Sequence, residues 1–242
     1  MKVEVCVTSV DAAKIAERAG ADRLELCSEL AVGGVTPSAG LLQTIRDTVH
    51  IPVHVLIRPR SGNFTYSEHT FSQMLRDISY CRQLGFDGIV TGCLHEDNRL
   101  NRTGMQRLAE ASGDLHLTFH RAFDRIPDWE TALVELEALG VDTILTSGQA
   151  ASALQGFSRL EDLVQRAGCG IMPGGGIRPS NLERFAGKGF EAVHLSALER
   201  PAPELFSGLP LNTPRLLREG APLLPDAGMI EAVVRAIKTS RK

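Results

Sequence analysis

One short phrase recurs four times along this chain and sets the spacing of its secondary structure. Each copy is a glycine, then an acidic residue two positions later, then an apolar run, and the copies begin at Gly20, Gly85, Gly140 and Gly189. The glycine is typical of a helix end, because it adopts the left-handed conformation without steric cost. The apolar run that follows predicts a strand. Each copy is therefore expected to join a helix to a strand.

Further strand-like segments lie between these copies and at the start of the chain, which makes eight strands in all. They alternate with amphipathic stretches at about 11–19, 38–48, 71–84, 102–111, 128–139, 158–167, 180–187 and 227–238. Eight strand–helix units in 242 residues indicate a single (β/α)8 TIM barrel of the α/β class. An open doubly wound sheet is the alternative, but no GxGxxG string follows the first strand.

The chain has no Pro/Gly/Ser-rich linker, so residues 1–242 are expected to form one domain. Its least regular part is a segment at about 199–225, rich in proline and leucine, which we expect to cap the barrel before the last helix at about 227–238.

Composition and charge argue against several classes of protein. With 26 basic and 29 acidic residues the formal net charge is −3. The chain therefore lacks the excess of positive charge that is typical of nucleic-acid-binding domains. No stretch approaches the roughly 18 apolar residues of a membrane span, and the chain opens on an alternating strand rather than a secretory signal. We therefore expect a cytoplasmic protein with reduced cysteines and with neither nucleic acid nor membrane as a partner.

Strand alternation predicts a polar barrel interior. Apolar residues alternate along the strands and are expected to face outward, against the helices. The inward positions are Glu4, Cys6, Glu25, Cys27, His54, Leu56, Arg58, His116, Thr118, His120, His194 and Ser196. Buried charges are costly unless paired, so one interpretation is a structural network, for instance Glu25 paired with Arg58. The other is a functional site, because active sites of this fold lie where the strands end.

Several residues at the predicted mouth suit an anionic ligand. Arg58 and Arg60 end the third strand, and guanidinium groups bind carboxylates and phosphates in a bidentate manner. The loops after strands 7 and 8 form the common phosphate site of this fold, with backbone N–H groups as donors. The residues expected to bind substrate are Glu25, Arg58, Arg60, Gly174, Gly175, Gly176, His194 and Ser196.

His120 and Asp124 form the candidate catalytic pair. His120 ends the fifth strand and Asp124 follows four residues later. A histidine with a nearby carboxylate can form an oriented acid–base pair. The sequence is therefore compatible with a TIM-barrel enzyme of unknown reaction that acts on a small phosphorylated or carboxylated metabolite.

Cys6 and Cys27 form a separate candidate site. They end the first two strands with the same inward parity, and neighbouring strands lie about 4.8 Å apart. Two thiolates at that spacing could share a soft cation such as Cu(I). A free cysteine is also often only a small buried apolar residue. Cys81, Cys93 and Cys169 do not share this placement.

Short strings spread through about residues 1–198 together match one known family. They are EVC at 4–6, GADRLELC at 20–27, GGVTPS at 33–38, IRPR at 57–60, YS at 66–67, TFHRAFD at 118–124, LTSG at 145–148 and GGGI at 174–177, with His194 and Ser196. In these strings the chain resembles the CutC family of copper homeostasis proteins. The resemblance implies a cytoplasmic, homodimeric TIM barrel that is linked to copper tolerance or Cu(I) binding. It also implies that Cys6 and Cys27 are the copper ligands.

The chain departs from the family pattern in two places. The loop after Arg60 reads SGNF, where the family usually has GGDF, so a carboxylate is lost at Asn63. Residues 199–225 lack the family's usual segment before the last helix. Two hypotheses stay open: a copper protein that binds Cu(I), and an enzyme that acts on a small anionic metabolite. A two-thiolate copper carrier has no need of the arginines, the candidate pair His120 and Asp124, or the triple glycine.

Overall fold

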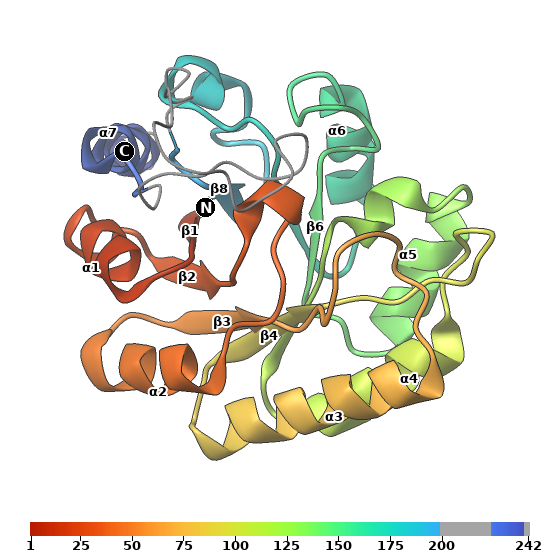
Figure 1. Cartoon of the computed structure of the whole chain (residues 1–242). Coiled ribbons are helices and arrows are strands. Elements are labelled where there is room, and N and C mark those ends of the chain that lie inside the picture. Colours follow the sequence, from red (N-terminus) through yellow and green to blue (C-terminus); the bar gives the residue numbers. More distant parts are fainter. Residues whose placement is uncertain (199–223, 240–242) are drawn as a thin grey trace, which may run out of the picture.

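The computed structural model describes residues 1–198 and 224–239, and these form a (β/α)8 barrel (Figure 1). Eight strands lie in the order β7-β6-β5-β4-β3-β2-β1-β8, and an isolated parallel bridge between Gly174 and His194 links β7 to β8. The strands are β1 (Lys2–Val7), β2 (Arg23–Leu26), β3 (Val53–Leu56), β4 (Gly88–Thr91), β5 (His116–Phe119), β6 (Thr143–Thr146), β7 (Gly170–Pro173) and β8 (Ala192–Leu195). The predicted TIM barrel is confirmed.

Helices surround the strands, as Figure 1 shows. They are α1 (Val10–Arg18), α2 (Ala39–Thr48), α3 (Glu68–Gln83), α4 (Arg102–Ser112), α5 (Trp129–Ala138), α6 (Phe157–Arg166) and α7 (Ala227–Thr239), with the short 3-10 helices η1 (Leu30–Val32), η2 (Arg121–Arg125) and η3 (Pro179–Arg184). None of the helices in the described part of the chain is long and apolar enough to cross a membrane.

One helix differs from the sequence-based expectation, and the expected cap segment falls almost wholly outside the described residues. An amphipathic helix was expected at about 180–187, but the structure has only the 3-10 helix η3 there. Gly187 and Gly189 follow it, both with positive φ, and leave no room for further regular turns before β8. The irregular cap expected at about 199–225 lies outside the described residues, apart from its last two positions.

The fourfold phrase has a structural role at the N-terminal end of the barrel. Its four glycines have φ values of +88, +70, +76 and +88 degrees, as a helix end requires. The acidic residues Asp22, Asp87 and Asp142 each accept a hydrogen bond, 2.7–2.9 Å long, from a backbone N–H at the start of the preceding strand. The repeat therefore fastens β2 to β1, β4 to β3 and β6 to β5. Glu191 instead contacts side chains, among them the hydroxyl of Thr143.

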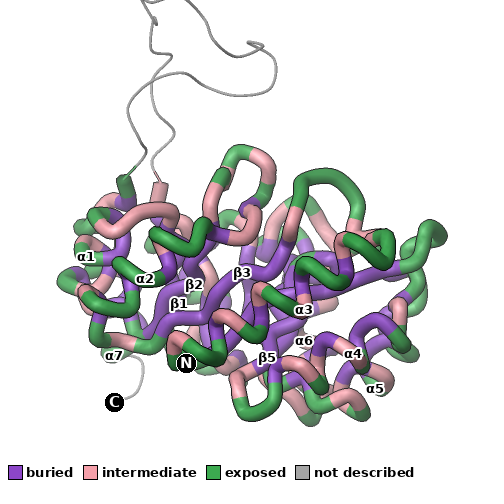
Figure 2. Tube along the Cα trace, turned by 60° about the horizontal axis from the view of Figure 1, so that its bottom comes forward, coloured by how far each residue is buried: buried purple, intermediate pink, exposed green. Residues whose placement is uncertain are grey.

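The two faces of the strands pack against different surroundings. The outward alternates, such as Val5, Leu24 and Val193, belong to the main apolar core between barrel and helices. Figure 2 shows this buried layer running through the strands, with exposed segments on the outside of the helices and loops. Inside the barrel the apolar clusters are small, and the larger one joins Cys27, Leu56 and Val90. The remaining interior is polar, as the alternation predicted.

Candidate functional site at the barrel mouth

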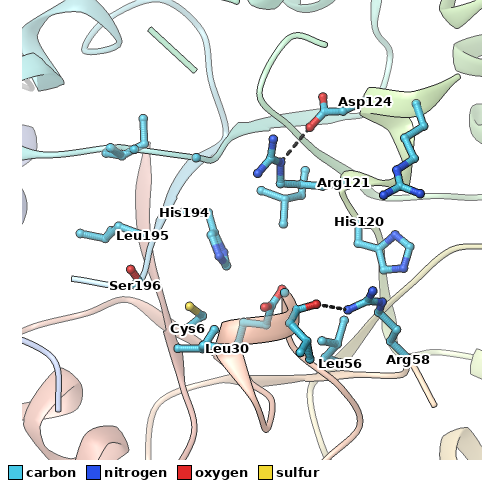
Figure 3. A pocket seen from close by; sticks show the side chains of 18 of the residues that line it. Cys6, Leu30, Leu56, Arg58, His120, Arg121, Asp124, His194, Leu195 and Ser196 are labelled. Atoms are coloured by element: carbon cyan, nitrogen blue, oxygen red, sulfur yellow. Dashed lines mark hydrogen bonds and ion pairs between the residues drawn. The ribbon is translucent and has the colours of Figure 1, made fainter. Parts of the chain in front are cut away.

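A cavity of about 500 Å³ opens where the barrel strands end, and most of the predicted site residues line it (Figure 3). Nine of them do so: Cys6, Glu25, Arg58, His120, Asp124, Gly175, Gly176, His194 and Ser196. Arg60, Gly174 and Cys27 are outside its lining. The cavity is thus built mainly from strand ends and from the loops that follow them, where the fold places its active sites.

Glu4 is the centre of a buried ionic network beneath this cavity. In the strand register it lies opposite Arg23 on one side and His194 on the other. The Arg23 Nε atom donates to Glu4 Oε2 at 2.5 Å, and His194 Nδ1 lies 2.8 Å from Glu4 Oε1. Burial acts to raise the pKa of Glu4, but Arg23 and His194 outweigh it and lower the pKa to about 2. Glu4 is therefore a carboxylate with both oxygens engaged.

His194 carries a positive charge in this arrangement. Burial acts to lower its pKa, but the charge of Glu25 and hydrogen bonds with Cys6 and Glu4 raise the pKa well above the ordinary value. A protonated ring donates Nδ1–H to Glu4, which fixes the orientation of the imidazole. The edge of the ring that faces the cavity is thus held in place by a carboxylate below it.

Glu25 presents a carboxyl group at the floor of the cavity. It lies opposite Cys6 in the register, and its Oε2 atom is buried with no hydrogen-bond partner among the described residues. Burial, followed by the nearby charge of Glu4, raises its pKa to about 7 in spite of His194. The pairing with Arg58 that a structural network would need is not formed, since Arg58 binds loop carbonyls instead.

Cys6 and Cys27 both lie inside the barrel, but at different depths. Cys6 is opposite Glu25 in the register and lines the cavity, whereas the Cys27 N–H donates to the Val7 carbonyl, further along the strands. Cys27 is fully buried in the cluster with Leu56. Burial raises the pKa of both thiols, and the proximity of Cys6 raises that of Cys27 further. Both are therefore thiols rather than thiolates in the metal-free protein.

Arg58 and Arg60 have different surroundings although they are two residues apart. Arg58 is buried, and its Nη1 atom donates to the carbonyls of Val32 and Gly34 at 2.9 and 2.6 Å. Arg60 points away from the cavity, and its Nη2 atom donates to Asn63 Oδ1 at 2.8 Å. Asn63, where the family usually has aspartate, thus serves as an acceptor for Arg60 within one loop.

His120 and Asp124 are near each other in the sequence, but the structure does not join them by a hydrogen bond. Asp124 accepts from Thr146 Oγ1 at 2.5 Å and from the Ser147 N–H at 3.0 Å, so it anchors the loop after β6. Arg121 also donates to it, at 2.8 Å. The Nδ1 atom of His120 instead accepts from the Ala122 N–H at 3.3 Å. Burial, assisted by the charge of Arg58, lowers the pKa of His120 to about 3, so the ring is neutral.

The glycine loop after β7 brings the backbone close to an arginine. Gly175 and Gly176 have φ values of +95 and +83 degrees, a region that only glycine enters at little cost. A Cβ atom on Gly175 would lie 3.4 Å from Arg121 Nη1. This loop and Arg121 therefore form one side of the cavity.

Three charged residues of the site were missed by sequence reasoning. Arg23 shares the inward parity of Glu25, so the alternation that placed Glu25 could also have placed Arg23. Glu4 was assigned to the interior but not to the site. Arg121 lies in a 3-10 helix, where no periodicity shows which way a side chain points. Its position could only come from the folded chain.

Comparisons with known proteins agree with this architecture. The family model described as the CutC family matches residues 1–199. The chain belongs to the CutC family. It is 47% identical over 199 residues to the CutC family protein of Yersinia pestis (strain Pestoides F), which covers 81% of this chain and 78% of that protein. The CutC family protein of Proteus mirabilis (strain HI4320) is 47% identical over 197 residues, with 81% and 79% covered.

Solved structures show the same fold. The copper homeostasis protein CutC from Streptococcus agalactiae superimposes with a TM-score of 0.77 at 33% identity, over 81% of this chain and 99% of that one. A thiamine phosphate pyrophosphorylase from Pyrococcus furiosus has a TM-score of 0.62 at 12% identity, over 100% and 97%. The second likeness shows the barrel alone. Several CutC-like strings of the sequence, including the one that contains His120, contribute residues to the cavity.

Proposed function

We propose that this member of the CutC family acts in copper homeostasis in the cytoplasm and binds Cu(I) through Cys6 and Cys27. The observation that carries the proposal is that two cysteines on adjacent strands both lie inside the barrel, and that one of them lines the cavity. Sulfur ligands select Cu(I) over harder cations. The S. agalactiae relative is described as a copper homeostasis protein, which supports the same assignment.

The chemistry of the donor set determines how such binding would proceed. Because burial raises the pKa of both thiols, Cu(I) has to displace their protons before sulfur can bind it. Apparent affinity is therefore expected to rise with pH. The cavity gives the ion a route to Cys6, while Cys27, further along the strands and outside the cavity lining, offers the second sulfur.

A Cu(I) titration against a competing chelator tests this proposal. Cys6→Ser and Cys27→Ser should each weaken binding strongly, because each removes one of two ligands. Cys81→Ser and Cys93→Ser are matched controls, since these thiols are equally buried but outside the barrel interior. Unchanged affinity in the Cys6→Ser/Cys27→Ser double variant would refute the site. The homodimer that the family resemblance implies stays a prediction, to be checked by light scattering.

A second function is favoured by the arginines of the cavity, which a copper carrier does not need. Arg58, Arg121, Arg125 and Arg178 all line it, together with the glycine loop. Guanidinium groups and exposed backbone amides are the groups that bind carboxylates and phosphates. We propose as the alternative that the barrel is an enzyme acting on a small anionic metabolite. If neither phosphates nor small carboxylates raise the melting temperature of the wild type, this alternative fails.

A further inference from the structure

Three residues that line the cavity each have one buried polar atom with no hydrogen-bond partner among the described residues: Glu25 Oε2, Arg58 Nε and His120 Nε2. Buried polar groups in folded proteins are nearly always satisfied, and exceptions need an explanation. Each of these atoms belongs to a side chain no more than 6% exposed. Their common place in the lining of one cavity indicates a binding site for a polar ligand.

The chemical character of two of these atoms is defined by their surroundings. The Nδ1 atom of His120 accepts a hydrogen bond from the Ala122 backbone, so the neutral ring carries its proton on Nε2. His120 Nε2 is therefore a donor. Arg58 Nε is a donor at every accessible pH. Two residues on one side of the cavity thus each have an N–H group without a partner among the described residues.

These donors are rigidly held and lack a compensating negative charge. The Phe64 ring lies 4.7 Å from the His120 ring and 5.3 Å from the Arg58 guanidinium carbon, and so packs against both. Arg58 forms no ion pair with any carboxylate in the part of the chain that the structure describes; its other nitrogens bind carbonyl oxygens. A fixed cation with a free N–H beside a second fixed donor is suited to an anion.

The floor of the cavity has a different character. In Figure 3, Arg58 and His120 lie on one side of the cavity, and Cys6 and His194 lie on the other. Glu25, at the floor of the cavity, lies between the two sides, because in the register it is opposite Cys6 of β1 and His54 of β3, the strand that Arg58 follows. Its unpartnered Oε2 can accept a hydrogen bond from a hydroxyl group. The cavity lining therefore combines two donors on one side with a hydrogen-bond acceptor at the floor.

We propose that the barrel mouth binds a small carboxylate with a hydroxyl group on the adjacent carbon. The carboxylate accepts from Arg58 Nε and His120 Nε2, and the hydroxyl group meets Glu25. Two donors on one side match the two oxygens of a carboxylate. This inference rests on the alternative function above and names its substrate class.

Isothermal titration and thermal shift with four probes test the proposal: glycolate, pyruvate, acetate and inorganic phosphate. Glycolate should bind the wild type more tightly than pyruvate and acetate, which lack the hydroxyl group. His120→Phe keeps the ring against Phe64 but removes the donor, and should weaken glycolate binding about tenfold or more. Glu25→Gln should reduce the preference of the protein for glycolate over acetate. His69→Phe, an exposed position, is the control and should bind as the wild type does.

Each outcome supports the proposal or overturns it. If phosphate binds and glycolate does not, the anionic pocket stands but the carboxylate class is wrong. If no probe binds, the alternative function fails together with this inference. If glycolate binds His120→Phe and the wild type equally, the assignment of the donors is overturned. Should His120→Phe fail to fold, His120→Gln retains an N–H donor, and loss of binding in a folded His120→Gln would count against the proposal.

Discussion

His54 allows a quantitative test of the polar barrel interior. It lies on β3, is 3% exposed, and its ring is 4.8 Å from that of His116. Burial, together with the charge of Arg23, lowers the pKa of His54 from the ordinary 6.5 to about 3, although Glu4 opposes the shift. The folded protein therefore keeps His54 neutral where the unfolded chain protonates it.

The sign and size of the effect follow from this difference. Below pH 6.5 the unfolded chain binds a proton that the folded one does not, so stability is lost as the pH falls from 6.5 towards 3. One pH unit within this window is worth about 1.4 kcal/mol. Between pH 6.5 and pH 4.5, His54 alone should then lower the free energy of unfolding by about 3 kcal/mol.

Urea denaturation at pH 7.5 and pH 4.5 measures this loss. The wild type should lose about 3 kcal/mol more than His54→Gln between the two pH values. The exposed position His69 provides a control, and His69→Gln should retain the steep wild-type dependence. A Cβ on Gly88 would lie 2.7 Å from the His54 ring, so this side chain also fills space beside β4. Lost packing in His54→Gln would lower the free energy of unfolding equally at both pH values, so only the difference between the two pH values tests the titration of His54. A pH dependence in His54→Gln as steep as that of the wild type would refute the reasoning.

Two further predictions concern the network and the backbone. Glu4→Gln leaves the buried Arg23 charge with only its longer contact to Glu191, at 3.6 Å, and should lower the free energy of unfolding by about 3–5 kcal/mol in urea titrations. Glu68→Gln, which breaks the exposed pair with Arg107, should cost about 1 kcal/mol at most, and equal losses would contradict this account. Gly148→Ala should lower the melting temperature much more than Gly140→Ala, although both glycines have positive φ. A Cβ on Gly148 would lie 2.2 Å from the Gly156 carbonyl oxygen, whereas nothing lies within 4 Å at Gly140.

The architecture was predictable because its signals are local. The glycine–acid phrase marks a helix end and a strand start within a few residues, and the structure uses Asp22, Asp87 and Asp142 in the same way at three strand pairs. Inward and outward faces were also predictable, since side chains alternate with a period of two. Residues such as Glu4 and Cys6 are inside the barrel for that reason.

The partners of the interior residues could not be predicted in the same way. Alternation says that Glu25 and Arg58 share the interior, but not that Glu25 lies opposite Cys6 while Arg58 binds the carbonyls of the loop after η1. Those relations depend on the stagger between strands, which is set by closure of the whole barrel. Loop conformation is a second feature that the sequence does not predict. Asp124 lies four residues after His120, but it accepts hydrogen bonds from Thr146 and Ser147 instead of pairing with His120.

The sequence by itself determined the barrel, the four helix-to-strand junctions marked by the glycine–acid phrase and the polar residues of its interior, because these follow from helix ends and from strand periodicity. Only the tertiary structure decided that Glu4 joins Arg23 to His194, that the two thiols lie at different depths, and that the two cavity residues with unpartnered N–H groups lie on one side. These relations join residues up to 190 positions apart in the chain, and strand register and loop conformation bring them together.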